Sequence, residues 1–225
     1  MLINPGTNDI YIDGSVAVLG HHSVAYDLIT KLRNKDTSTE TFRLSTDALT
    51  RMLVYEATSS LPTESVTIES PLCPLVGTML SSQSRIIFVP ILRAGESMVA
   101  GALSMFKGAA IAPVDISRNE ETAMPTIRSV KLPKKFQPTD IIITLDPMLA
   151  TGGSLSSTIG VIKVRGGKNI RSIAIFSAPE GLEHMKSDHP DVTIYTATVD
   201  SHLDDRAYIV PGCGDFGDRY FNIEI

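Results

Sequence analysis

Tryptophan is absent from this chain of 225 residues, aromatic residues make up only 6%, and just two cysteines are present. Cys73 and Cys213 cannot build a disulfide framework or a four-cysteine zinc site, and so few thiols are typical of a reducing compartment. Basic residues are also scarce, because 20 Lys and Arg face 25 Asp and Glu, which gives a net charge of −5. Proteins that bind phosphate backbones without sequence preference usually carry the opposite sign, so we do not expect nucleic acid as the main partner.

Long apolar runs are missing as well. The longest clean one, Ile86–Leu92, is far shorter than the run of about 18 residues that a membrane span needs. The first basic residue is Lys31, so we expect no signal peptide, no membrane contact and a cytoplasmic location. The composition, 43% hydrophobic and 20% charged, supplies a real core, and this length favours one α/β domain with insertions.

Hydrophobic periodicity predicts two helices over about residues 23–60, the second opened by Thr37 with Glu40 at capping-box spacing. Strands and helices then alternate. Strands are predicted at 66–68, 86–92, 110–116, 141–145, 170–176, 192–197 and 208–210, and helices at 95–106, 153–164 and 180–186. This alternation favours a parallel sheet with helices on both faces, and such sheets bind ligands outside the carboxyl ends of their strands.

The most informative stretch follows the strand at 141–145, which ends in Asp146. We call residues 146–154 the 146–154 loop; after Asp146 it consists of Pro147, Met148, Leu149, Ala150, Thr151, Gly152, Gly153 and Ser154. Small residues leave the backbone N–H groups uncovered, and a helix start and two hydroxyls complete a cradle for a phosphate monoester. The carboxylate is well placed for sugar hydroxyls next to that phosphate. The plainer alternative is a tight strand-to-helix turn capped by Thr151 or Ser154.

Two further segments carry groups suited to anions. Arg93 comes directly after the strand at 86–92, and its planar guanidinium suits phosphate or pyrophosphate if that strand neighbours 141–145. An arginine that caps a helix is the alternative. The stretch 118–138 begins with Arg118 and is polar, with three prolines, which predicts a mobile loop or, alternatively, a solvated hairpin.

Gly212–Gly217 reads Gly-Cys-Gly-Asp-Phe-Gly and formally matches a dinucleotide fingerprint. Only eight residues follow it, and they do not begin a helical pattern with room to run, so we reject that interpretation. We expect instead a backbone loop that closes over something flat. The five histidines show no metal-ligand spacing and are expected to be surface or capping residues, and no nucleophile elbow appears, which disfavours a nucleophilic hydrolase.

Taken in order, the segments 54–58, 89–95, 118–122, 146–154, 177–181 and 208–219 resemble the motifs of uracil phosphoribosyltransferases, over roughly residues 25–221. The resemblance implies a single domain over 1–225 with the type I phosphoribosyltransferase fold, a Rossmann-like, mainly parallel sheet flanked by helices. It also implies a mobile loop or hairpin at 118–138 and a C-terminal base-binding hood at 208–225. The first 20 residues match nothing in the family and read as an irregular arm.

The reaction implied by this resemblance joins uracil to phosphoribosyl pyrophosphate (PRPP) in pyrimidine salvage, giving UMP and pyrophosphate. Mg²⁺ is expected to enter through PRPP, with no direct protein ligand. Family members often form dimers or tetramers, and some are activated by GTP. In this chain the 146–154 loop would hold the ribose hydroxyls and the 5′-phosphate, while Arg93 and Arg118 would contact the pyrophosphate side.

The uracil ring would be framed largely by backbone groups of Ile209, Gly214, Asp215 and Phe216. Asp215 would also lie near PRPP, which makes Arg93 and Asp215 the candidate catalytic residues. Two other functions stay open at this point. One is a phosphoribosyltransferase for another base, such as a purine or orotate. The other is a regulatory protein of the same fold that senses UMP and binds RNA.

Overall fold

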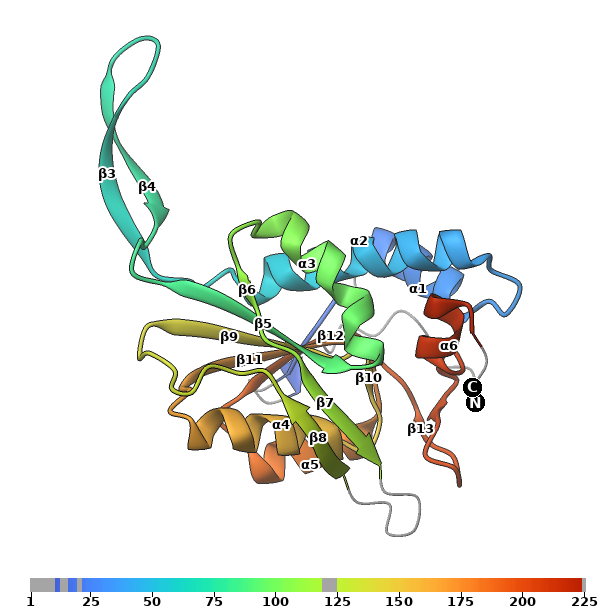
Figure 1. Cartoon of the computed structure of the whole chain (residues 1–225). Coiled ribbons are helices and arrows are strands. Elements are labelled where there is room, and N and C mark those ends of the chain that lie inside the picture. Colours follow the sequence, from blue (N-terminus) through green and yellow to red (C-terminus); the bar gives the residue numbers. More distant parts are fainter. Residues whose placement is uncertain (1–10, 13–15, 20–21, 119–124, 224–225) are drawn as a thin grey trace.

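A computed structural model describes residues 11–12, 16–19, 22–118 and 125–223. Its centre is a sheet with the strand order β1-β2-β12-β11-β9-β5-β7-β8 (Figure 1). These strands are β1 Tyr11–Ile12, β2 Val16–Val18, β5 Arg85–Leu92, β7 Val114–Arg118, β8 Pro125–Val130, β9 Asp140–Leu145, β11 Asn169–Ser177 and β12 Thr193–Val199. Neighbours run parallel except in the pairs β1–β2 and β7–β8, so the predicted mainly parallel sheet is confirmed.

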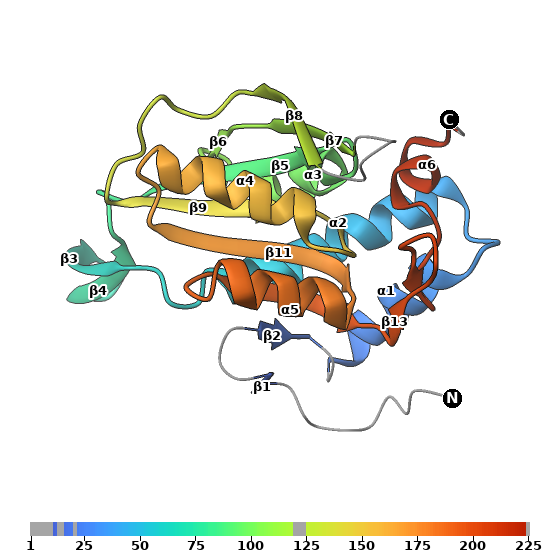
Figure 2. The same ribbon diagram turned by 90° about the horizontal axis from the view of Figure 1, so that it is seen from below.

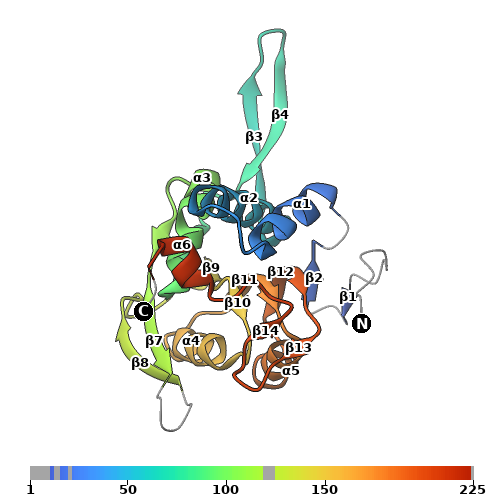
Figure 3. The same ribbon diagram turned by 90° about the vertical axis from the view of Figure 1, so that its right-hand side faces the viewer.

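Helices cover both faces of the sheet, as Figure 2 and Figure 3 show. One face carries α1 (Ser23–Arg33), α2 (Thr39–Ala57), a 3₁₀ turn (Ala94–Met98) and α3 (Val99–Met105), and the other carries α4 (Gly153–Val164) and α5 (Pro179–Asp188). The central strand β9 is buried along its whole length because its side chains alternate between two apolar layers. Ile143 packs with the layer under α2, and Ile142 packs with the layer under α4.

The start of α2 lies one residue from the predicted cap. Ser38 is the N-cap, and its Oγ accepts a hydrogen bond of 3.2 Å from the backbone N–H of Thr41. The Thr37 hydroxyl instead donates to the carbonyl of Lys31 at 2.7 Å. The capping-box assignment to Thr37 is therefore wrong, because two adjacent hydroxyl residues can serve as caps and only the backbone decides between them.

Two other expectations need correction, and one alternative is decided for the described residues. The strand predicted at 110–116 is broken around Pro113 into β6 (Ala110–Ile111) and β7, both beside β5. Part of the arm predicted to be irregular forms β2, which pairs with β12 and buries Val16. Within 118–138 the chain forms β8, antiparallel to β7, which matches the hairpin alternative for the described residues. Residues 119–124 lie outside the described part of the chain.

A second hairpin stands away from the body of the molecule (Figure 1). It consists of β3 (Thr63–Glu69) and β4 (Pro74–Leu80), paired from Thr63 opposite Leu80 to Glu69 opposite Pro74. The strand predicted at 66–68 is present within β3, but it pairs with β4 in this separate hairpin, so its predicted place in the parallel alternation is wrong. Both strands are exposed along almost their whole length, including the apolar side chains of Ile68, Leu75, Val76, Met79 and Leu80.

The C-terminal segment forms its own small unit. β14 (Ile209–Val210) pairs antiparallel with β13 (His202–Leu203), and α6 (Phe216–Phe221) follows. No helix was predicted at 216–221, because six residues are too few to show a helical period. Among the residues that the structure describes, no helix is both long and apolar enough to cross a lipid bilayer.

Candidate active site

The two motif-bearing strands β5 and β9 are parallel neighbours, with Pro90 opposite Leu145. Arg93 and Asp146 therefore leave the sheet at the same edge, as the sequence argument required. The two connections also touch: a Cβ added at Gly95 would lie 2.2 Å from the carbonyl oxygen of Leu145. No larger residue fits at position 95, and this close approach fixes the Arg-Ala-Gly turn against the start of the 146–154 loop.

The 146–154 loop passes through the short strand β10 (Met148–Leu149), parallel to β11, and ends at Gly152, the N-cap of α4. Gly152 has a φ of +81°, a left-handed conformation that favours glycine, and it has no side chain with which to cap the helix. The N-cap of α4 is therefore Gly152, and neither Thr151 nor Ser154 occupies that position. Backbone N–H groups of the first turn of α4 are left for a ligand, and the positive end of the helix dipole favours an anion there.

A small pocket of about 100 Å³ lies along this loop. It is lined by the 146–154 loop without Pro147, together with Leu155: Asp146, Met148, Leu149, Ala150, Thr151, Gly152, Gly153, Ser154 and Leu155. Of the other residues predicted to bind PRPP, Arg93 and Asp215 do not line it, and the side chain of Arg118 is not described. Asp146 is half-buried and accepts a hydrogen bond of 3.3 Å from the backbone N–H of Met148. Burial nevertheless raises the pKa of its carboxyl to about 7, so the group changes charge near neutral pH.

Helix α5 supports the loop in a way that sequence reasoning missed. A Cβ on Gly181 would lie 2.3 Å from the carbonyl oxygen of Ala150, so the helix backbone packs directly on the loop. One turn further on, Nδ1 of His184 lies 2.7 Å from the carbonyl oxygen of Thr151, and its Nε2 lies 3.0 Å from Oδ2 of Asp188. The spacing of His184 and Asp188, four residues apart on a helix, was the available signal. His184 was expected to be only a surface or capping residue.

Arg93 connects the sheet edge to the C-terminal helix. Its Nη2 lies 2.6 Å from Oδ1 of Asp218 in an ion pair, and its guanidinium carbon lies 5.5 Å from the centre of the Phe221 ring. It precedes the 3₁₀ turn without a side-chain capping bond, so the capping alternative for this arginine does not hold. The backbone of Arg118 ends β7, opposite Pro125, and its side chain falls outside the described residues.

The glycine-rich C-terminal turn lies beside the 146–154 loop, because Sγ of Cys213 is 3.9 Å from Sδ of Met148. Asp200 holds the turn in place: its carboxylate accepts from the N–H of Gly212 at 2.8 Å and from both terminal nitrogens of Arg33, at 2.5 and 2.9 Å. Gly212 has a φ of +54°, and a Cβ there would lie 2.1 Å from the carbonyl oxygen of Ile209. The turn is therefore tight and can only be built with glycine.

The four predicted base-framing residues come together in this turn, but not all through their side chains. Ile209 is buried, and Phe216 is buried edge-on against Phe42 with ring centres 4.9 Å apart. Asp215 is the N-cap of α6 and accepts from the N–H of Asp218 at 2.9 Å. A Cβ on Gly214 would meet nothing within 4 Å, so backbone is open at this position.

Comparison with known proteins settles which family has this arrangement. The family model described as uracil phosphoribosyltransferase matches residues 18–223. The chain belongs to the uracil phosphoribosyltransferase family. Proteins of that name from Dictyoglomus turgidum and Oceanobacillus iheyensis are each 42% identical to it, over 206 and 208 residues that cover 92% of this chain and 98% of theirs.

Solved structures agree with this membership. The structure of the AQ2163 protein from Aquifex aeolicus is 35% identical, with a TM-score of 0.84 over 93% of this chain and 99% of that one. Adenine phosphoribosyltransferase from Leishmania donovani, 13% identical, has a TM-score of 0.54 over 91% of this chain and 89% of its own, which shows the shared fold alone. The type I phosphoribosyltransferase fold predicted from the motifs is thus confirmed.

Cys213 lies in the glycine-rich C-terminal turn, and its thiol lacks the low pKa of a nucleophilic cysteine. Burial raises the pKa of its thiol to about 12, although the guanidinium groups of Arg219 and Arg33 act in the opposite direction. A thiol with such a pKa stays protonated at neutral pH.

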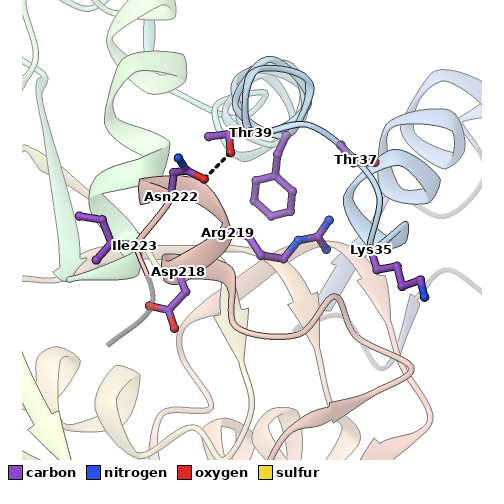
Figure 4. Close-up of a pocket in the computed structure, with 8 residues that line it drawn as sticks. Lys35, Thr37, Thr39, Asp218, Arg219, Asn222 and Ile223 are labelled. Atoms are coloured by element: carbon purple, nitrogen blue, oxygen red, sulfur yellow. Dashed lines mark hydrogen bonds between the residues drawn. The ribbon is translucent and has the colours of Figure 1, made fainter.

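A larger cavity of about 550 Å³ lies on the other side of α6, between that helix and the connection from α1 to α2 (Figure 4). Lys35, Thr37, Thr39, Phe42, Asp218, Arg219, Asn222 and Ile223 line it. Arg219 fastens the C-terminal turn from this side, with bonds of 2.8 Å to the carbonyl of Cys213 and 2.6 Å to that of Asn34. The residues predicted for PRPP and uracil do not line this cavity.

Proposed function

We propose that this member of the family transfers the phosphoribosyl group of PRPP to uracil, releasing UMP and pyrophosphate, as an enzyme of pyrimidine salvage. One observation carries the proposal. The N–H-lined pocket of the 146–154 loop and the glycine-rich backbone turn of 208–217 adjoin each other, in contact through Met148 and Cys213. A sugar phosphate and a neutral, planar base can thus be held side by side.

In this proposal the backbone N–H groups after Ala150 bind the 5′-phosphate of PRPP, helped by the hydroxyls of Thr151 and Ser154. Asp146 binds the ribose hydroxyls at the other end of the same pocket. Its pKa of about 7 lets this carboxyl act as an acceptor, a donor or both near neutral pH. The intervening residues 147–149 contribute backbone and shape the floor of the pocket.

Uracil presents two carbonyls and an imide N–H, which neutral backbone groups can recognise without any charged side chain. We assign this recognition to the backbone of Ile209, Gly214, Asp215 and Phe216. The turn is held by Asp200, Arg33 and Arg219 from outside, so its backbone is fixed before the base arrives. Orotate carries a carboxylate, and residues 208–217 contain no Lys or Arg of their own to bind it; Arg33 and Arg219 beside the turn are already bonded to its carbonyls.

Displacement at the anomeric carbon proceeds through a state with oxocarbenium character, so the enzyme must orient the base nitrogen and stabilise the departing pyrophosphate. We assign the pyrophosphate to Arg93 and Arg118 and place Asp215 near the reacting groups. The ion pair with Asp218 uses one of the five N–H donors of Arg93, which leaves others for the leaving group.

Among the described residues, no three His, Cys, Asp or Glu side chains gather into a metal site. Asp146 is the one acidic side chain in the lining of the small pocket. These residues suit a Mg²⁺ that enters on the oxygens of PRPP, and we propose that route. When bound in this way, the ion neutralises charge on the leaving pyrophosphate.

A panel of bases tests the proposed function. Uracil, orotate, hypoxanthine and adenine are each mixed with the enzyme, PRPP and Mg²⁺, and pyrophosphate release is measured. Of the four bases, only uracil should give pyrophosphate release. Release with a purine or with orotate in place of uracil would reassign the substrate, and no release with any base would contradict a transferase function and favour the ligand-sensing alternative.

We also propose that the protein is a homo-oligomer, with the β3–β4 hairpin in contact with a second copy. An isolated two-stranded hairpin is marginally stable in water, yet this one exposes Leu72, Val76 and Met79. Light scattering should give the mass of at least a dimer, and the double variant Val76→Ser, Met79→Ser should give a lower mass.

The family resemblance leads to two further predictions. GTP should accelerate uracil turnover, and PRPP should slow proteolysis within 118–138.

A further inference from the structure

His184 connects α5 to the 146–154 loop by two hydrogen bonds. One ring nitrogen, Nδ1, faces the carbonyl oxygen of Thr151 at 2.7 Å, and the other, Nε2, faces the carboxylate of Asp188 at 3.0 Å. Asp188 is itself fixed, because the hydroxyl of Ser156 on α4 donates to the same carboxylate oxygen at 2.7 Å. The imidazole ring therefore has a hydrogen-bond partner at each of its two nitrogens, although the side chain itself is exposed.

Both partners of the ring are acceptors, a carbonyl and a carboxylate. The Ser156 hydroxyl and the neighbouring histidines hold the pKa of the Asp188 carboxyl below its usual range, so it accepts as a carboxylate. A proton on Nδ1 lets the ring donate to the Thr151 carbonyl, and the separation of 2.7 Å is that of a well-formed hydrogen bond.

The direction of the Thr151 carbonyl fixes the next N–H group. In a trans peptide the C=O and the N–H of the following residue point in opposite directions. The carbonyl of Thr151 points at His184, so the N–H of Gly152 points away from α5. Gly152 lines the small pocket, and a Cβ on it would lie 3.3 Å from Nδ1 of His184, which shows how closely the ring packs against this peptide.

We propose that His184 is a positioning residue for phosphate binding: by holding the Thr151 carbonyl toward α5, it aims the Gly152 N–H at the 5′-phosphate. Without this bond the Thr151 carbonyl loses the contact that holds it toward α5, and one donor of the phosphate cradle is directed less well. The inference rests on the proposed function, since it requires that the 146–154 loop binds the 5′-phosphate. It predicts that replacing His184 weakens the binding of ligands that carry a 5′-phosphate and does not change the binding of uracil or pyrophosphate.

The test uses product inhibition of the full-length enzyme. In His184→Ala, the KM for PRPP and the inhibition constant of UMP should each rise about ten-fold, the loss expected for one hydrogen bond to a charged group. The KM for uracil and the inhibition constant of pyrophosphate should stay within about two-fold, since neither ligand has a 5′-phosphate. Ser187→Ala, an exposed change on the same helix, is the matched control and should resemble wild type.

Two amide variants separate positioning from mere packing. His184→Asn carries its amide nitrogen near the place of Nδ1 and should restore UMP inhibition to within about three-fold of wild type. His184→Gln carries its amide near Nε2, keeps the Asp188 contact, and should behave like His184→Ala. These two variants also serve if His184→Ala does not fold, which thermal unfolding would show.

The outcomes distinguish this inference from the proposed function. Wild-type enzyme that does not turn over uracil and PRPP contradicts the function itself. Wild-type turnover with unchanged UMP inhibition in His184→Ala, or with Asn and Gln variants that behave alike, overturns the role of His184 and leaves the function standing. A rise in the pyrophosphate constant equal to that for UMP would likewise contradict a role confined to the phosphate cradle.

Discussion

Replacement of Gly95 by Ala tests the contact between the two loops at the edge of the sheet. The new Cβ would lie 2.2 Å from the carbonyl oxygen of Leu145, and real Cβ contacts essentially never fall below 3.0 Å. The Arg-Ala-Gly turn and the 146–154 loop must therefore separate by at least about 0.8 Å. Neither side yields easily, because the partner is backbone at the end of the buried strand β9 and not the flexible end of a side chain.

Forced overpacking of this kind costs about 1–3 kcal/mol of folding free energy. At this chain length that lowers Tm by roughly 2–4 °C for each kcal/mol. The larger effect is on activity: a displacement near 1 Å between Arg93 and Asp146 should reduce kcat/KM for PRPP about 100-fold. The assay is steady-state pyrophosphate release, with unfolding followed by calorimetry on the same preparations.

Gly108→Ala is the matched control, since a Cβ at this exposed glycine meets nothing within 4 Å. It should leave kcat/KM unchanged and keep Tm equal or slightly higher, because alanine restricts the unfolded chain. If Gly95→Ala retained wild-type kcat/KM and Tm, the two loops would not be in the contact on which the site depends.

Three other changes test separate parts of the site. Arg93→Ala should lower kcat/KM for PRPP by roughly 2–4 kcal/mol of transition-state binding, and wild-type kinetics would refute its assignment to pyrophosphate. Folding raises the pKa of Asp146 from 3.8 to about 7, so ionisation of this carboxyl destabilises the fold increasingly as the pH rises through that interval. The Tm of Asp146→Asn should therefore exceed that of the wild type by more at pH 8 than at pH 5. An equal difference in Tm at the two pH values would contradict this. A thiol reagent should modify exposed Cys73 quickly and buried Cys213 only after unfolding, and two rapid modifications in the native protein would show that the turn is open.

Much of the fold followed from local patterns. The buried strands β5, β9, β11 and β12 are short segments rich in apolar and β-branched residues that alternate with helices, so their existence and parallel arrangement could be predicted without knowing their partners. The β3–β4 hairpin could not, because its exposed strands combine apolar and polar residues without a buried face. The edge strand β2 depends on pairing with β12, about 180 residues away, and no local signal records that contact.

The site shows the same division. The 146–154 loop and the C-terminal turn were located from the sequence because bare backbone at the end of a strand is visible as glycine and small residues. The sequence did not show which residues the side chains of the site would contact. Phe216 turned out to pack on Phe42, Arg93 to pair with Asp218, and His184 to hold Thr151, and each of these depends on a residue brought near only by the fold.

A crystal structure of the enzyme with UMP tests the central claim most directly. We predict the 5′-phosphate within hydrogen-bonding distance of the backbone N–H groups at 151–154, and the pyrimidine ring against the backbone of 209–216. A phosphate bound elsewhere, or a ring that lies away from the glycine-rich turn, would contradict the account.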